Sequence, residues 1–156
     1  MVEHVLRREQ WLPRPIDEVF EFFSDARNLE AITPPWLGFR ILATGPIEMK
    51  AGTRIRYRIR LRGLPMGWLT EIQEWDPPRQ FVDVQLRGPY KLWRHTHRFE
   101  SVDGGTMVHD EVRYALGFGP IGRLVHAWTV RRDVETIFDY RARRMEELFG
   151  NGSARE

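Results

Sequence analysis

Two histidines and two aspartates lie in three consecutive segments that alternate polar and apolar residues, as strands do. They are Asp83 in segment 80–87, His95 and His97 in segment 91–100, and Asp110 in segment 106–115. An imidazole held beside a carboxylate is the most common arrangement for proton transfer in proteins. These four side chains are therefore the candidates for catalysis, should the protein be an enzyme.

The turns between the segments predict which side chains face each other. The tightest register through Gly88-Pro89 sets Phe81 against His97, Asp83 against His95 and Gln85 against Trp93. Asp103-Gly104 favours a two-residue type I′ turn, which sets His97 against Asp110. Facing side chains have Cβ atoms about 4.5–5.5 Å apart. We therefore expect each histidine to pair with the aspartate that faces it.

Three roles are open for these Asp-His pairs. They can satisfy each other's hydrogen bonds, because a lone buried carboxylate costs several kcal/mol. They can also fix the polar end of an apolar ligand, or transfer protons through His95 or His97. Both histidines with Asp83 or Asp110 could chelate a metal, but no further metal signature accompanies them. We expect no metal and no cofactor.

The surrounding pattern predicts an α+β fold. Further strands are expected at 3–12, 38–43, 54–62 and 67–75. Two short helices follow the first strand, one after Pro15 and one capped by Asp25 and stopped by Pro34-Pro35. Apolar spacing of three and four then predicts a long helix from about Ile121 to Phe149. The predicted order is β-α-α-β6-α, with the long helix on the apolar face of an antiparallel sheet.

Composition narrows the class of protein. The chain has 156 residues, 42% of them hydrophobic, which fits one domain; we place it at 1–150, followed by a disordered tail at 151–156. No apolar stretch is long enough to span a membrane and the N-terminus does not resemble a signal peptide, so we expect a cytoplasmic protein without membrane insertion. Cysteine is absent, and a net charge of +2 with interspersed acidic residues argues against a nucleic-acid partner.

A row of arginines alternates with apolar residues along one expected strand. The row comprises Arg54, Arg56, Arg58, Arg60 and Arg62. Alternation predicts one solvated and one buried face, so we expect these arginines to be exposed and to contribute little to stability. An interaction surface is the alternative interpretation.

Several local sequences resemble those of the SRPBCC superfamily, the START-like or birch-pollen-allergen-like proteins with a helix-grip fold. They are Pro15–Phe20, Asn28–Trp36, Glu74–Pro78 and Gly88–Tyr90, within a resemblance that spans about residues 3–149. The chain is similar in particular to the bacterial polyketide cyclase/dehydrase-like or coenzyme Q-binding-like branch. The resemblance implies a curved sheet of about seven strands around a long C-terminal helix, in a superfamily that includes lipid carriers and cyclases.

A strongly curved sheet leaves space that one helix cannot fill, so inward-facing aromatic residues would line a cavity. We expect the ligand site to comprise Tyr57, Trp68, Phe81, Asp83, Gln85, Trp93, His95, His97, Asp110, Tyr114, Leu124 and Trp128. The predicted function is binding of a small hydrophobic or aromatic molecule, such as a lipid, quinone or polyketide-like compound. The alternative is a cyclase or dehydratase that uses the same histidines and aspartates. The sequence sets neither the ligand nor the oligomeric state.

Overall fold

The computed structural model describes residues 2–61, 63–117 and 119–150. Its elements, in chain order, are β1 His4–Leu12, α1 Ile16–Phe23, η1 Ala26–Asn28, α2 Leu29–Ile32, η2 Pro35–Leu37, β2 Arg40–Ile41, β3 Arg54–Leu61, β4 Leu64–Asp76, β5 Gln80–Arg87, β6 Leu92–Val102, β7 Gly105–Ala115, α3 Gly119–Val125, η3 His126–Val130 and α4 Arg131–Phe149. This order confirms the predicted α+β class.

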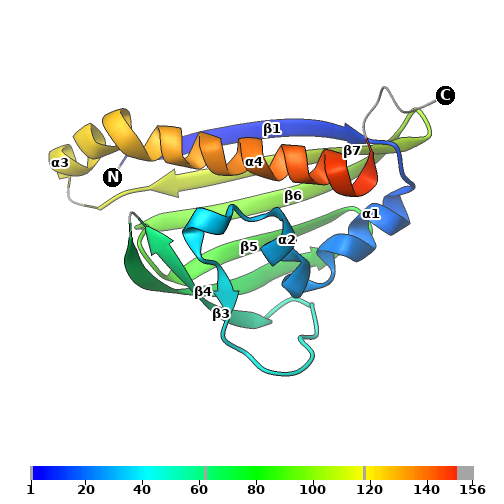
Figure 1. Ribbon diagram of the computed structural model, residues 1–156, viewed down its shortest axis with the longest axis horizontal. Helices are drawn as coiled ribbons and strands as arrows, with labels where there is room; N and C mark the ends of the chain where they lie inside the picture. Colours follow the sequence, from blue (N-terminus) through cyan, green and yellow to red (C-terminus); the bar gives the residue numbers. More distant parts are fainter. Residues whose placement is uncertain (1, 62, 118, 151–156) are drawn as a thin grey trace.

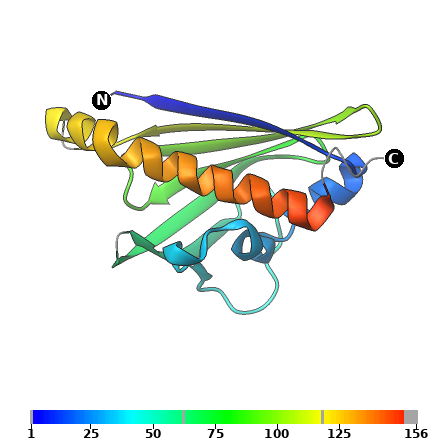
Figure 2. The same ribbon diagram turned by 45° about the horizontal axis from the view of Figure 1, so that its top comes forward.

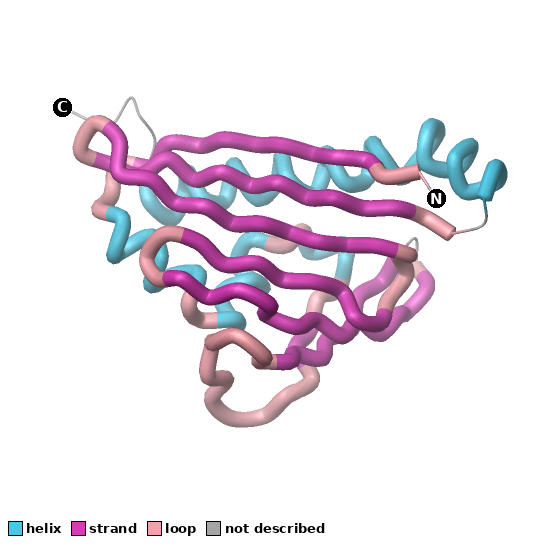
Figure 3. Tube along the Cα trace, turned by 180° about the vertical axis from the view of Figure 1, so that it is seen from behind, coloured by secondary structure: helices cyan, strands magenta, loops and turns pink. Residues whose placement is uncertain are grey.

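The strands form one seven-stranded antiparallel sheet in the order β1-β7-β6-β5-β4-β3-β2. The register between β4 and β5 shifts at Leu69/Thr70 and again at Ile72/Glu74, and such bulges bend and twist a strand. Figure 1 shows the helices on one side of the curved sheet. In Figure 3, which views the protein from the opposite side, the strands lie in front of the helices. The helices thus cover one face and leave the other to solvent.

Both predicted hairpin registers are confirmed where the strands pair. Phe81 faces His97 and Asp83 faces His95 across β5 and β6, and His97 faces Asp110 across β6 and β7. The φ angles of Asp103 and Gly104 are 50° and 77°, as a type I′ turn requires. Turn chemistry therefore fixed which residues the sheet brings together.

Some predicted boundaries differ. The segment expected at 38–43 pairs only over Arg40–Ile41, and β4 starts at Leu64 rather than at residue 67. Arg54, Arg56, Arg58 and Arg60 are exposed, as predicted, whereas residue 62 and the tail at 151–156 lie outside the described residues. No helix in the described part of the chain is long and apolar enough to cross a membrane.

The C-terminal helical run begins as α3, passes through the π-helical turn η3 and continues as α4 (Figure 2). The buried side chains of α4 are Val134, Phe138, Met145 and Phe149. Hydrogen bonds hold this helix in place, among them the bond from Gln10 Nε2 of β1 to the carbonyl of Ala142 at 2.8 Å and the bond from Arg144 Nε to the carbonyl of Ala31 at 2.9 Å.

The hydrophobic core is divided into three clusters. One centres on Phe20, Phe81 and Phe99 below α1. A second lies between the sheet and the start of α4, around Tyr114. The third joins Ala26, Ile41 and Ile55. A compact domain usually has one contiguous core, so this division points to space between the clusters.

Candidate functional site

A cavity of about 160 Å³ lies between the sheet, α4 and the α1–η2 segment. Members of all three core clusters border it, including Phe81 from the first, Phe138 from the second and Ile55 from the third. A cavity of roughly this volume accommodates at least one aromatic ring. The cavity expected between sheet and helix is therefore present.

Seven of the residues predicted for the ligand site border this cavity: Tyr57, Trp68, Phe81, Asp83, Trp93, His95 and His97. Asp110 lies one hydrogen bond behind the wall, at a smaller cleft of about 50 Å³ between β1 and α4. Tyr114 is buried against Trp93 and Tyr90 and does not reach the cavity. The sheet thus brings together most of the predicted residues.

Gln85 has a different place from the one expected. Its side-chain amide donates to the carbonyl of Tyr90 at 2.7 Å and accepts from the Tyr90 N–H at 3.1 Å, across the β5–β6 turn. A Cβ at Gly88 would lie 2.5 Å from Gln85 Oε1, so only glycine leaves room for this arrangement. Gln85 therefore positions Tyr90, which does border the cavity.

Leu124 and Trp128 do not face inward. Their exposed fractions are 61% and 76%, and neither borders the cavity. Two features explain the difference from the prediction. Trp128 lies within the π-helical turn η3 and Leu124 precedes it. Such a turn holds more residues than an α-helical turn, so it rotates both residues away from the buried stripe of α4. In Figures 1 and 2 the α3 end also extends past the strands, so no sheet lies beneath it.

The histidines and aspartates bond crosswise rather than to the residue each one faces. His95 Nε2 lies 2.7 Å from Asp110 Oδ1, and His97 Nε2 lies 2.6 Å from Asp83 Oδ2. Nε2 is the far nitrogen of the ring, so it reaches a diagonal neighbour, whose Cβ is about 7–8 Å away, better than a facing one. The predicted hydrogen-bond partners were therefore wrong although the registers were right, and of the predicted pairs His97 and Asp110 still lie near each other, with 3.6 Å between Nδ1 and Oδ1.

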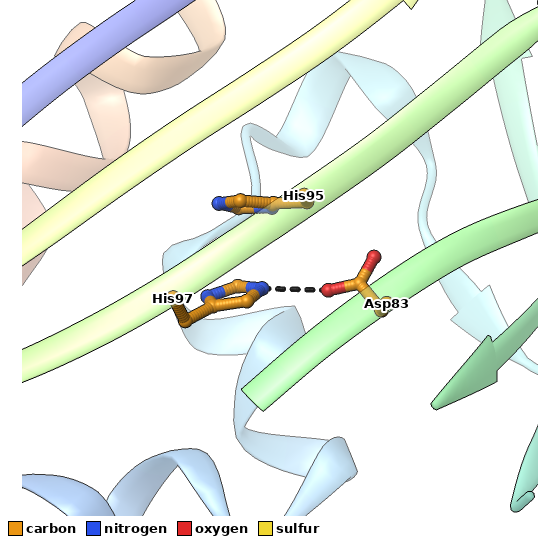
Figure 4. A group of neighbouring side chains, drawn as sticks. All are labelled: Asp83, His95 and His97. Carbon is orange, nitrogen blue, oxygen red and sulfur yellow. Dashed lines mark hydrogen bonds and ion pairs between the residues drawn. The ribbon is translucent and has the colours of Figure 1, made fainter. Parts of the chain in front are cut away.

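The two imidazole rings stack on each other between an aromatic ring and α4. The His95 and His97 ring centroids are 3.6 Å apart, and His97 stacks on Phe81 at 3.9 Å. Figure 4 shows the stacked rings with the Asp83 carboxylate beside His97. Both rings are almost fully buried. This stack forms a polar corner in a wall that is mostly apolar.

Arg141 of α4 completes the corner. Its Nη2 atom lies 3.4 Å from both Asp110 Oδ1 and His97 Nδ1. The guanidinium carbon also lies 5.3 Å from the Phe23 ring centre and 5.6 Å from that of Phe138. Arg141 borders both the cavity and the smaller cleft, and the contacts found for it within the described residues use Nη2 alone. Among the described residues no hydrogen bond uses its other N–H groups, which could donate to a ligand.

The charges of the corner follow from burial and these contacts. Burial alone would raise the pKa of Asp110, but the Arg141 charge and the hydrogen bond from His95 hold it far below its usual range. Burial also opposes ionisation of Asp83, yet the hydrogen bond from His97 and nearby cationic groups leave its pKa lowered. Both carboxylates are therefore ionised at neutral pH, and the Arg141 charge lowers the pKa of each.

His97 is neutral at neutral pH. Burial, together with the charge of His95, lowers its pKa to about 4 despite the bond to Asp83. A neutral ring that donates from Nε2 to a carboxylate has a lone pair on Nδ1, which is the atom that Arg141 approaches. The contacts thus assign the proton to Nε2. One oxygen of Asp83, Oδ2, is used in this bond, and Asp83 borders the cavity.

A second polar group lies in the cavity wall formed by β3 and β4. The Tyr57 hydroxyl and Thr70 Oγ1 are 3.1 Å apart, and Trp68 Nε1 donates to the same Thr70 oxygen at 3.0 Å. Burial, reinforced by the Asp83 charge, raises the pKa of Tyr57 far above its usual value, so the phenol stays neutral. Thr70 therefore keeps two large aromatic side chains in fixed orientations.

Ligand atoms of Asp83, His95 and His97 lie within 4.8 Å of one another, close enough to consider a metal ion. A metal bound to imidazole lies in the plane of the ring, about 2.0–2.1 Å from nitrogen. Rings stacked 3.6 Å apart at an angle of 28° do not direct their lone pairs to one point. Metal binding here would require at least one ring to turn.

The sequence matches the model of the family described as polyketide cyclase / dehydrase and lipid transport over residues 12–141. The chain belongs to this family. Solved structures agree on the fold. The protein TTHA0849 from Thermus thermophilus has 23% identity and a TM-score of 0.66, covering 93% of this chain and 99% of that one. A comparison with curated proteins finds no significant match.

Two further structures share the fold that was predicted for this member of the polyketide cyclase/dehydrase and lipid transport family. The Zhui aromatase/cyclase from Streptomyces sp. R1128 has 17% identity and a TM-score of 0.65, with coverage of 94% and 96%. Ara h 8.0201 has 18% identity and a TM-score of 0.64, with coverage of 94% and 99%. Identities this low establish a shared fold.

Among the polar or aromatic residues of the family member's cavity that sequence reasoning missed are Thr70, Tyr90 and Arg141. A signal for Arg141 was present, because it falls between Phe138 and Met145 at the spacing of three and four that marks the buried stripe. A charged residue on that stripe must find a partner inside. Tyr90 and Thr70 carried no comparable signal.

Proposed function

We propose that this chain binds a small hydrophobic or aromatic molecule in the cavity between the sheet and α4, and that residues 1–150 form a single ligand-binding domain. One observation carries the proposal: an apolar cavity wall with a single charged corner made by Asp83, His95, His97 and Arg141. Ligand sites are typically apolar with a few polar groups that orient the ligand. Membership of a family described by cyclisation and lipid transport supports the same class.

The corner also indicates which polar groups a ligand would carry. The Asp83 carboxylate at the cavity accepts a hydrogen bond from a hydroxyl group, and the spare N–H groups of Arg141 donate to a carbonyl or carboxylate. Asp110 already balances the Arg141 charge, so Asp83 provides the surplus negative charge. We expect ligands with a hydroxyl donor at one end to bind better than the same hydrocarbon without it.

Calorimetric titration with 2-naphthol and with naphthalene tests this. Asp83→Asn should weaken 2-naphthol binding by about tenfold or more, because hydrogen bonds to charged groups contribute about 1.5–3 kcal/mol. Naphthalene binding should change little. The matched control is Asp139→Asn, the same substitution at an exposed position of α4. Failure of the wild-type protein to bind either compound would refute the cavity proposal, and equal binding by both variants would refute the role of Asp83.

A cyclase or dehydratase is the second candidate, because a carboxylate, an imidazole and a guanidinium all border one cavity. In a dehydration, Asp83 would remove a proton from the carbon next to a carbonyl that Arg141 polarises, and the hydroxyl would leave as water after protonation by His95. The products are an enone and water, so no further reactant is needed.

Conversion of 4-hydroxy-4-phenylbutan-2-one to its conjugated enone, followed by absorbance, tests this second candidate. Asp83→Asn should reduce turnover by about 100-fold or more if the carboxylate is the base. If the wild-type protein shows no more turnover than Asp83→Asn while binding of 2-naphthol persists, the enzyme candidate fails and the binding proposal stands.

A further inference from the structure

The first part of the C-terminal helical run exposes four large apolar side chains. Ile121, Leu124, Val125 and Trp128 have exposed fractions of 70%, 61%, 45% and 76%. Residues three and four apart share a face of a helix, so these four form one patch, which we term the helix-tip patch. Single exposed apolar residues are ordinary, whereas a contiguous group of them marks an interaction surface.

Charges follow the helix-tip patch in a fixed order along the axis. The patch spans about 10 Å at 1.5 Å per residue. Arg131 and Arg132, both exposed, come one turn later, and the exposed acids Glu135 and Asp139 come after them. These exposed side chains therefore change from apolar to basic to acidic along the sequence. Figure 2 shows the helical run extending from its α3 end across the sheet.

We propose that this helix tip docks onto the surface of an anionic lipid bilayer. The helix-tip patch would enter the boundary between headgroups and acyl chains, a depth of about 5–10 Å for such helices. Arg131 and Arg132 would then lie at the level of the lipid phosphates, and the acidic residues would stay in water. The helix does not span the bilayer, which agrees with the lack of a spanning helix in the described residues.

The charge order favours lipid over a second copy of this chain. In a two-fold dimer centred on the patch the same segment meets itself, and the sequence of residues 112–130 contains no acidic residue to balance Arg131 and Arg132. An anionic surface instead attracts every arginine that approaches it. Docking does not depend on the proposed cavity ligand, although a lipid surface is where an apolar ligand would be found.

Co-sedimentation with vesicles tests the proposal. The probes are vesicles of phosphatidylcholine alone and of phosphatidylcholine with one-third phosphatidylglycerol. The wild-type protein should bind the anionic vesicles, and Leu124→Ser with Trp128→Ser should weaken that binding by about tenfold or more. Trp36→Ser is the matched control, because Trp36 is 57% exposed on η2 and does not border the cavity. It should bind like the wild type.

Two further measurements test separately the contributions of the arginines and of Trp128 to vesicle binding. Arg131→Gln with Arg132→Gln should reduce the preference for anionic vesicles by about tenfold or more, and added salt should do the same. Brominated lipids should quench the fluorescence of the wild-type protein more than that of Trp128→Phe, which keeps an apolar side chain at that position. Both variants change exposed residues, so unchanged melting temperatures should accompany these effects.

Specific outcomes would overturn the proposal. Absence of binding to anionic vesicles, or equal binding by wild type and by the Leu124 and Trp128 double variant, removes the helix tip as a lipid site. Equal binding to both vesicle types removes the anionic preference. If sedimentation without vesicles shows a dimer that the double variant dissociates, and no vesicle binding occurs, the occupant is a second copy of the chain.

Discussion

Acidification should destabilise this protein in a way that can be assigned to His97. Its pKa is near 6.5 in the unfolded chain and about 4 in the folded protein. The folded state thus binds fewer protons than the unfolded state between these values. The contribution is complete above pH 6.5 and is lost as the pH falls toward 4, amounting to roughly 2 kcal/mol less stability at pH 5 than at pH 8.

Urea unfolding at pH 5, 6, 7 and 8 measures this dependence, with His97→Gln as the test. Glutamine can still donate a hydrogen bond to Asp83 but does not titrate, so the variant should lose most of the pH slope while being less stable overall. Val112→Ala, at a fully buried position facing His95, is a destabilised control that should keep the slope. An equal slope in His97→Gln and wild type would refute the assignment.

Three more predictions test the supporting contacts. Gly88→Ala should cost about 1–2 kcal/mol in urea unfolding, because its Cβ displaces the Gln85 amide, and it should cost much less when Gln85 is already alanine. Arg141→Met should lower the free energy of unfolding by about 3–5 kcal/mol, because a buried carboxylate loses its cation; a loss below 1 kcal/mol would contradict the charge balance described. Reversing Arg56 and Arg58 to glutamate should shift the free energy of unfolding by less than about 1 kcal/mol, and a larger loss would mean that the exposed row is structural.

The sheet could be predicted from the sequence because the patterns that specify its strands and registers are local. The period of two in β3, the Asp103-Gly104 turn and the Gly-Pro turn each specify a strand or a register without reference to distant residues. That is why the face of His95 and His97 was assigned correctly. Which aspartate each histidine bonds depends on ring geometry and stacking, which strand alternation does not specify.

The helix positions were less predictable for two physical reasons. A period of three and four predicts which residues share a helix face, but an inserted π turn rotates the residues within it, such as Trp128, and those before it, such as Leu124. The sequence also does not say where the sheet ends beneath the helix. Arg141, by contrast, could have been predicted from the sequence. Its spacing places it on the buried stripe of the helix, and its partner, Asp110, was already a candidate site residue.

The division of the core has a consequence for how the protein opens. Three clusters separated by a cavity can fluctuate with partial independence, because few apolar contacts transmit the opening of one to the others. A bound apolar molecule would contact members of all three clusters and so join them into one continuous hydrophobic core. Its binding should therefore slow amide exchange in strands on both sides of the cavity together, and merge their separate opening free energies into one cooperative transition.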